Sequence, residues 1–153
     1  MINRRFSILA PVTVLILALS WTGCAKKIPP KETMVWLERF EPSVIQAAET
    51  QKPLMIEFMA AWCPSCRMMD DSTFVDPRVV EKSRLCVSVR IDVDKDSSLA
   101  NRFQANARKY GGVGIPNIIF MTPDQKVVAH PIGYMPADRL LAVMDSVLTV
   151  WKP

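Results

Sequence analysis

Residues 54–66, "LMIEFMAAWCPSC", place a short apolar run directly before a pair of cysteines in the pattern Cys-x-x-Cys. The length of the apolar run is typical of a buried β-strand. Pro64 suits the first turn of a helix, because a proline lacks the N–H group that would have no partner there. The stretch therefore predicts a strand that leads into a helix, with Cys63 and Cys66 at the start of that helix.

Cys-x-x-Cys occurs in several kinds of site, and the rest of the chain tests two of them. A tetrahedral zinc site needs about four ligands, and the chain offers only Cys24, Cys86 and His130 besides the pair, with no second pair at ligand spacing. Haem attachment requires a histidine directly after the second cysteine, and Arg67 stands there. We therefore expect neither a metal site nor a bound cofactor.

A structural disulfide and a redox-active pair both remain open. A disulfide across so short a loop stabilises a fold little, because the entropy of loop closure grows with loop length. At the N-terminus of a helix, unpaired N–H groups and the helix dipole favour the thiolate of Cys63. Cys66 follows about one turn later, within reach of a disulfide. The residues favour the redox pair.

The first part of the chain has the layout of a secretory signal peptide, which we assign to residues 1–23. Arg4 and Arg5 form a basic start, and Phe6–Leu19 is a run without charge. The end of the segment resembles a bacterial lipobox, in which the cysteine, here Cys24, is lipidated and becomes the first residue of the mature protein. Trp21 departs from the leucine that this pattern prefers. An uncleaved membrane-spanning helix is therefore the alternative.

Both alternatives place the chain after Cys24 on the outer side of the inner membrane. The expected location is the cell envelope, facing the periplasm, with attachment to the membrane through a lipid anchor. Residues 24–32 then form a linker, whose two adjacent prolines favour an extended spacer, and residues 33–153 form the domain. From Cys24 onward, 17 basic residues face 15 acidic ones, a net charge of +2. So small a charge gives no electrostatic basis for binding nucleic acid.

The domain alternates between strand and helix patterns. Residues 85–93 alternate apolar and polar positions, as a half-buried strand does, whereas residues 35–40 fit either a strand or a helical turn. We expect, in chain order, helix 42–50, strand 54–60, a helix from the cysteine motif to Ser72, strand 85–93, helix 99–110, a hairpin of strands 117–121 and 126–130, and helix 138–148. This order predicts an α/β domain with a central mixed sheet flanked by helices.

From about Trp36 to Val150 the chain resembles a thioredoxin-fold domain. The resemblance rests on "PLMIEFMAAWCPSC" (53–66), on "YGGVGIPNIIF" (110–120), which matches the segment around the cis-proline, and on "IGYMPADRLLAVM" (132–144), which matches the glycine turn into the last helix. Within that superfamily, "RMMDDSTFVDPRVVE" (67–81) is most similar to the C-terminal domain of the DsbD-type thiol:disulfide interchange proteins.

The resemblance implies roles for three residues. Cys63 is the nucleophile that attacks a substrate disulfide, and Cys66 resolves the mixed disulfide that forms. Glu57 occupies the position of a buried aspartate, where burial should raise its pKa. A carboxylate tuned in this way can take the proton from Cys66. The alternative is that Glu57 faces solvent.

The resemblance also implies a surface for substrates. Pro116 matches the cis-proline, which leaves the backbone of Ile115 free to pair with an extended substrate segment. Trp62 and Pro64 are expected to line this docking surface beside the cysteines. Asn117 departs from the threonine that is common after the proline.

The function implied is a membrane-tethered thiol:disulfide oxidoreductase of the cell envelope that reduces disulfides of client proteins. Its partners would be disulfide-containing envelope proteins and a membrane protein that donates electrons. The alternatives are a dithiol oxidase and a thioredoxin-fold binding module without catalysis. Among the other polar residues, we expect Cys86 to be buried as a small hydrophobic side chain, and His130, Asp70 and Asp71 to lie on the surface.

Overall fold

The computed structural model describes residues 32–109 and 114–151, with the backbone alone for residues 104–109. The predicted signal peptide, the lipidated Cys24 and nearly all of the predicted linker lie outside the described residues. Within the described part of the chain, no helix is both long enough and apolar enough to cross a membrane.

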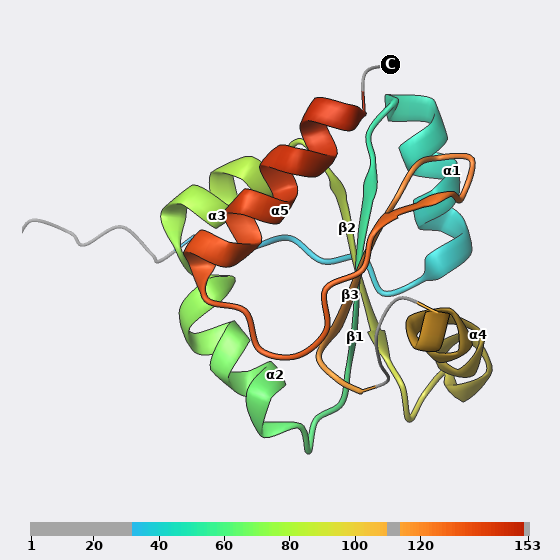
Figure 1. The fold of residues 1–153 in the computed structure, drawn as a ribbon, viewed down its shortest axis with the longest axis vertical. Helices are drawn as coiled ribbons and strands as arrows, with labels where there is room; N and C mark the ends of the chain where they lie inside the picture. Colours follow the sequence, from blue (N-terminus) through green and yellow to red (C-terminus); the bar gives the residue numbers. More distant parts are fainter. Residues whose placement is uncertain (1–31, 110–113, 152–153) are drawn as a thin grey trace, which may run out of the picture.

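A mixed β-sheet forms the centre of the fold (Figure 1). Strand β1 pairs in parallel with β2 and antiparallel with β3, and β4 pairs antiparallel with β3. The strand order is β2-β1-β3-β4, with β1 at Leu54–Met59, β2 at Val87–Asp92, β3 at Asn117–Met121 and β4 at Val127–Ala129. The predicted α/β class with a central mixed sheet is therefore confirmed.

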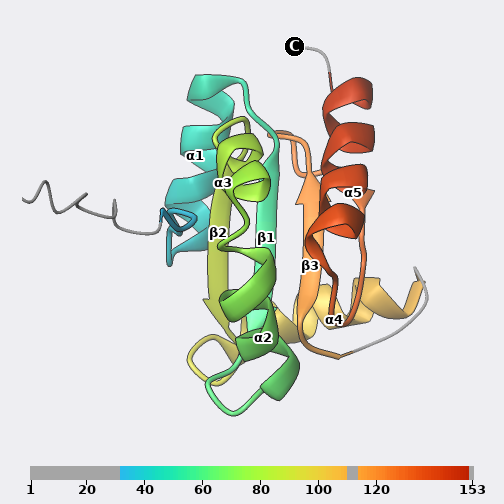
Figure 2. The ribbon, with the colours of Figure 1, turned by 90° about the vertical axis from the view of Figure 1, so that its left-hand side faces the viewer.

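Helices cover both faces of this sheet (Figures 1 and 2). One face carries α1 (Phe40–Thr50) and α4 (Ser97–Lys109). The other face carries α2 (Pro64–Met68), the π-helical turn η1 (Met69–Thr73), α3 (Pro77–Ser83) and α5 (Ala137–Val150). Because β1 is covered on both sides, its sequence is an almost unbroken apolar run rather than an alternating one.

The alternation of side chains along β1 divides the core into two layers. Leu54, Ile56 and Phe58 point to the layer beneath α1 and α4. Met55 points to the layer beneath α3 and α5, which also contains Ile118, Leu140 and Met144. The residue next in line on the Met55 face is Glu57, which is fully buried.

Two elements differ from the sequence-based expectations. Helix α3 was not predicted, although Asp76 and Pro77 carry the signal: Asp76 caps the helix by accepting a hydrogen bond from the Arg78 N–H at 2.9 Å, and Pro77 occupies the first turn. The helix after the cysteines ends in a π turn, closed by a 2.9 Å hydrogen bond from the Phe74 N–H to the Met69 carbonyl. Nothing in the sequence pattern pointed to this turn.

Candidate active site

Cys63 and Cys66 form a disulfide at the start of α2, with their Cα atoms 5.3 Å apart. Cys63 is the N-cap residue of the helix, and its sulfur accepts a hydrogen bond from the Cys66 N–H at 3.1 Å. The Cys63 N–H donates to the carbonyl of Ala60 at 3.0 Å, which ties the pair to the end of β1. After reduction, the same Cys66 N–H is placed to stabilise a thiolate on Cys63.

Glu57 lies inside the protein, with no exposed surface. Burial, the largest influence, raises the pKa of Glu57 to about 7, and the charge and hydrogen bond of Arg90 only partly oppose that rise. Its Oε1 atom is buried without a hydrogen-bond partner among the described residues. A carboxyl group with a pKa in this range both takes up and releases protons near neutral pH.

Arg90 links Glu57 to a second carboxylate, and this cluster was missed in the sequence. The Arg90 Nε donates to Oε2 of Glu57 at 2.7 Å, and one terminal nitrogen donates to Oδ1 of Asp70 at 2.5 Å. Asp70, expected on a solvated helix face, is 36% exposed, but it lies in the π turn η1 and pairs with Arg90. The sequence contained only a weak signal, a cation within the alternating pattern of residues 85–93.

The segment before β3 lies against the disulfide. The Ile115–Pro116 peptide bond is cis, and Ile115 packs on the cluster formed by Ala60 and the two cysteines. Asn117, the first residue of β3, is buried, and its Oδ1 lies 2.6 Å from Nε2 of His130. His130 is half-buried rather than on the surface as predicted, and burial lowers its pKa. Asn117 lies 13 residues before His130 in the sequence, and only the folded structure shows that the two side chains meet.

Exposed groups surround the buried disulfide. The Trp62 side chain is 61% exposed, and its indole N–H donates to Oδ2 of Asp94 at 2.8 Å. Pro64 occupies the first position of α2 and is exposed, as is Met68 at the end of that helix. Asp94 was not identified from the sequence, since nothing in its neighbourhood signals a contact with the tryptophan. These side chains form an accessible rim beside the redox pair.

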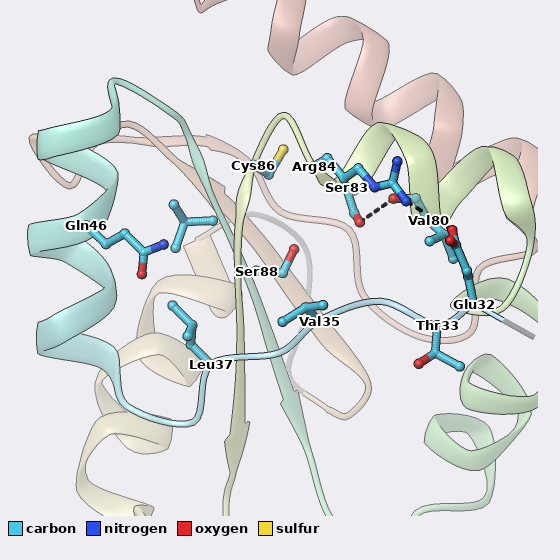
Figure 3. A pocket seen from close by; sticks show the side chains of 11 residues that line it. Glu32, Thr33, Val35, Leu37, Gln46, Val80, Ser83, Arg84, Cys86 and Ser88 are labelled. Atoms are coloured by element: carbon cyan, nitrogen blue, oxygen red, sulfur yellow. Dashed lines mark hydrogen bonds and ion pairs between the residues drawn. The ribbon is translucent and has the colours of Figure 1, made fainter. Parts of the chain in front are cut away.

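Cys86 lies far from this site. It directly precedes β2, whereas the disulfide follows the end of β1, and because these strands are parallel the two places are at opposite ends of the sheet. Burial raises the pKa of the Cys86 thiol to about 12. Figure 3 shows this thiol in the wall of a pocket, near Ser83 and Arg84. Cys86 is thus a buried side chain, as expected.

No group of three or more histidine, cysteine or acidic side chains in residues 32–109 and 114–151 is arranged to hold a metal ion. The redox pair, a buried acid and an accessible rim are the features that the described chain brings together. They suit thiol–disulfide exchange, which needs sulfur atoms, a proton acceptor and access for a second protein.

Comparison with known proteins supports this description. Residues 40–148 match the family described as a thioredoxin-like domain. The thiol:disulfide interchange protein DsbD of Campylobacter jejuni is 27% identical over 110 residues, which are 72% of this chain and 19% of that protein. The chain therefore spans about a fifth of the length of these DsbD relatives.

Solved structures show the same fold. A thioredoxin from Thermus thermophilus has a TM-score of 0.62 at 22% identity, covering 76% of this chain and 88% of the other. The reduced C-terminal domain of DsbD from Neisseria meningitidis has a TM-score of 0.53 at 24% identity, covering 67% and 88% respectively. The family match spans the Cys63–Cys66 disulfide and most of the chain, and the chain therefore belongs to the family of thioredoxin-like domains.

Proposed function

We propose that this protein is a membrane-tethered thiol:disulfide oxidoreductase of the cell envelope that reduces disulfides in client proteins. The observation that carries the proposal is the Cys63–Cys66 disulfide at the start of α2, with the buried acid Glu57 on the strand that leads to it. The similarity to DsbD over 72% of the chain supports the envelope location.

The reaction moves two electrons from the cysteine pair to the client. The Cys63 thiolate attacks one sulfur of the client disulfide; that disulfide breaks, a mixed disulfide forms, and one client thiolate leaves and takes up a proton. The Cys66 thiolate then attacks the Cys63 sulfur, which restores the Cys63–Cys66 disulfide and releases the second client thiolate. The client is reduced and the enzyme is oxidised.

Glu57 is the proposed base for the second step. Cys66 has to lose its proton before it attacks, and a buried carboxylate on β1 whose pKa lies near 7 accepts that proton without a large energetic cost. Trp62, Pro64 and the backbone of Ile115 next to Pro116 are the proposed contacts of the client segment. Ile115 packs on the cysteine cluster and would hold an extended client strand close to Cys63.

Reduction is the proposed direction for two reasons. The residues between the cysteines, Pro64 and Ser65, include no histidine to stabilise the thiolate further, and the similarity to DsbD points the same way. Each turnover leaves the pair oxidised, so a membrane protein with a reducing dithiol has to return two electrons. Such a donor attacks the Cys63–Cys66 disulfide and is itself oxidised.

A redox titration tests the direction. The full chain is equilibrated in defined thiol–disulfide buffers, and the state of Cys63 and Cys66 is followed by alkylation and mass spectrometry. A potential near that of thioredoxin, about −270 mV, supports the reductase. A potential near that of DsbA, about −120 mV, makes the protein a dithiol oxidase. A pair without a reversible transition contradicts the redox function itself.

Membrane attachment is tested separately with the variant Cys24→Ala. If Cys24 carries the lipid, the variant lacks the mass of the lipid and its chain is not processed after residue 23. If both proteins have the mass of the unprocessed chain without a lipid, and both are found in the membrane fraction, the result contradicts the lipid anchor and favours the uncleaved helix. The redox titration does not depend on this outcome.

A further inference from the structure

Two aromatic rings enclose the Arg90 side chain on the face of the sheet that carries Glu57. The Arg90 Cζ lies 4.4 Å from the centroid of the Trp36 ring and 5.4 Å from that of Phe74. The two rings meet edge to face, with centroids 5.0 Å apart and planes at 83°. Trp36 comes from the segment before α1 and Phe74 from the residue after η1, so distant parts of the chain converge on one guanidinium.

The backbone fixes Trp36 relative to Arg90. The next residue, Leu37, forms a parallel bridge with Val89 on the edge of β2. The Leu37 N–H donates to Ser88 at 2.9 Å, and the Arg90 N–H donates to the Leu37 carbonyl at 2.8 Å. These two bonds lie on either side of the bridge and hold the backbone next to Trp36 against the edge of β2, beside Arg90.

Arg90 needs such support because its side chain is partly exposed and can also adopt positions in solvent. Its side chain is 22% exposed, and it lines a pocket together with Trp36 and Asp92. A long side chain in a partly exposed ion pair loses conformational entropy when it is held in one position, and this cost offsets much of the attraction. An aromatic face that stacks on the planar guanidinium restricts its alternatives and adds a cation–π attraction.

We propose that Trp36 is a positioning residue of the redox site, which holds the Arg90 guanidinium against Glu57 and thereby controls the protonation of that carboxyl during the resolving step. The effect on the resolving step rests on the proposed role of Glu57 as the base for Cys66. In this proposal Trp36 contacts neither the reacting sulfur atoms nor the client, and it acts on Glu57 through Arg90.

The electrostatic surroundings of Glu57 make the effect measurable. Arg90 from β2 opposes the rise in the pKa of Glu57, and Asp70 from η1 adds to that rise. The facing residue of β3, Ile118, is apolar, as are the core residues that α3 and α5 contribute to this layer. The thiols of α2 do not titrate while they form the disulfide. In the oxidised protein, Arg90 is thus the cation that opposes the rise in the pKa of Glu57 caused by burial.

The test measures the Glu57 carboxyl directly in the oxidised full chain, in detergent, by NMR of ¹³C-labelled glutamate across a pH series. In Trp36→Leu, Arg90 spends less time on Glu57, and we expect the pKa of Glu57 to rise above its value of about 7. The expected rise is about 0.5 or more. Trp36→Phe keeps an aromatic face and should show a smaller rise. Trp151→Leu is the matched control, because Trp151 bonds to Gln51 at the other end of the sheet, and it should leave the pKa unchanged.

A double mutant separates positioning from loss of packing. If Trp36 acts through Arg90, then Trp36→Leu has no further effect on the Glu57 pKa in an Arg90→Met background. A fall in the pKa, no change, or an equal rise with and without Arg90 overturns the proposal; a fall would mean that Trp36 only keeps water away from Glu57. Thermal unfolding of each oxidised variant verifies that it is folded at the temperature of the titration.

The link to catalysis has its own readout. The rate at which Cys66 resolves a mixed disulfide on Cys63 is measured against pH for the wild type and Trp36→Leu. The pH midpoint of this rate should move upward with the Glu57 pKa. If the pKa moves and the midpoint does not, the catalytic part of the proposal is overturned, along with Glu57 as the base, whereas the redox titration of the cysteine pair still decides the proposed function separately.

Discussion

Glu57 and Arg90 occupy paired positions on the parallel strands β1 and β2, and the Arg90 Nε lies 2.7 Å from Oε2 of Glu57. Even so, burial raises the pKa of Glu57 to about 7, because desolvation outweighs the attraction of the Arg90 guanidinium. That guanidinium is partly exposed and is also paired with Asp70. The pairing keeps a buried acid ionisable near neutral pH without fixing it in the charged state.

The raised pKa predicts how stability depends on pH. The folded protein holds the Glu57 proton more tightly than the unfolded chain, whose value is 4.5. This contribution is fully present below pH 4.5 and is lost as the pH rises towards and past about 7. Glu57→Gln stays neutral and should therefore gain stability over the wild type between pH 5 and pH 8, by up to about 3 kcal/mol.

Urea unfolding of the oxidised protein at several pH values measures this difference. Taking the difference between the two proteins removes contributions from other groups, such as His130. Glu49→Gln, at an exposed position of α1, is the control and should run parallel to the wild type. A Glu57→Gln curve that also runs parallel to the wild type would contradict the raised pKa.

The order of attack predicts different products from two cysteine variants. With Cys66→Ser, Cys63 still attacks but nothing resolves the intermediate, so a mixed disulfide with the client should accumulate. With Cys63→Ser, no such adduct should form. Non-reducing electrophoresis followed by mass spectrometry identifies the adducts. Adducts on Cys66 in the Cys63→Ser variant, and none in the other, would reverse the assigned roles.

The exposed Trp62 should matter more for protein clients than for small disulfides. Its side chain, held by Asp94, offers apolar surface next to the redox pair, and aromatic side chains in such places often dominate protein contacts. In Trp62→Ala, kcat/KM for a disulfide-containing protein should fall about tenfold, which corresponds to about 1.4 kcal/mol. The rate with a small aromatic disulfide should change much less. Trp151→Ala controls for general loss of a tryptophan; equal losses with both substrates would argue against a docking role.

Cys86 should resist alkylation in the folded protein. Its thiol is buried and has a pKa of about 12, so almost no reactive thiolate exists at pH 8. Iodoacetamide treatment of the oxidised protein, with peptide mapping, should leave Cys86 unmodified, and the same treatment in denaturant should modify it fully. Rapid modification in the folded state would indicate that the pocket beside Cys86 opens.

Several features followed from the sequence because they depend on neighbouring residues. The apolar run of β1, the proline after Cys63 and the spacing to Cys66 are local, and they defined the strand, the start of the helix and the redox pair. The resemblance added the fold and the cis-proline segment. Helix α3 carried an equally local signal in Asp76 and Pro77.

The cluster around Glu57 could not be predicted in the same way, and the reason is strand register. A shift of one residue between β1 and β2 would turn Arg90 to the opposite face of the sheet, away from Glu57. The positions of Asp70 and Trp36 depend further on the π turn and on the bridge from Leu37 to Val89. The sequence by itself determined the strands, most of the helices and the sulfur chemistry. The tertiary structure decided which charges surround the buried acid, because those contacts join segments whose relative placement no local pattern specifies.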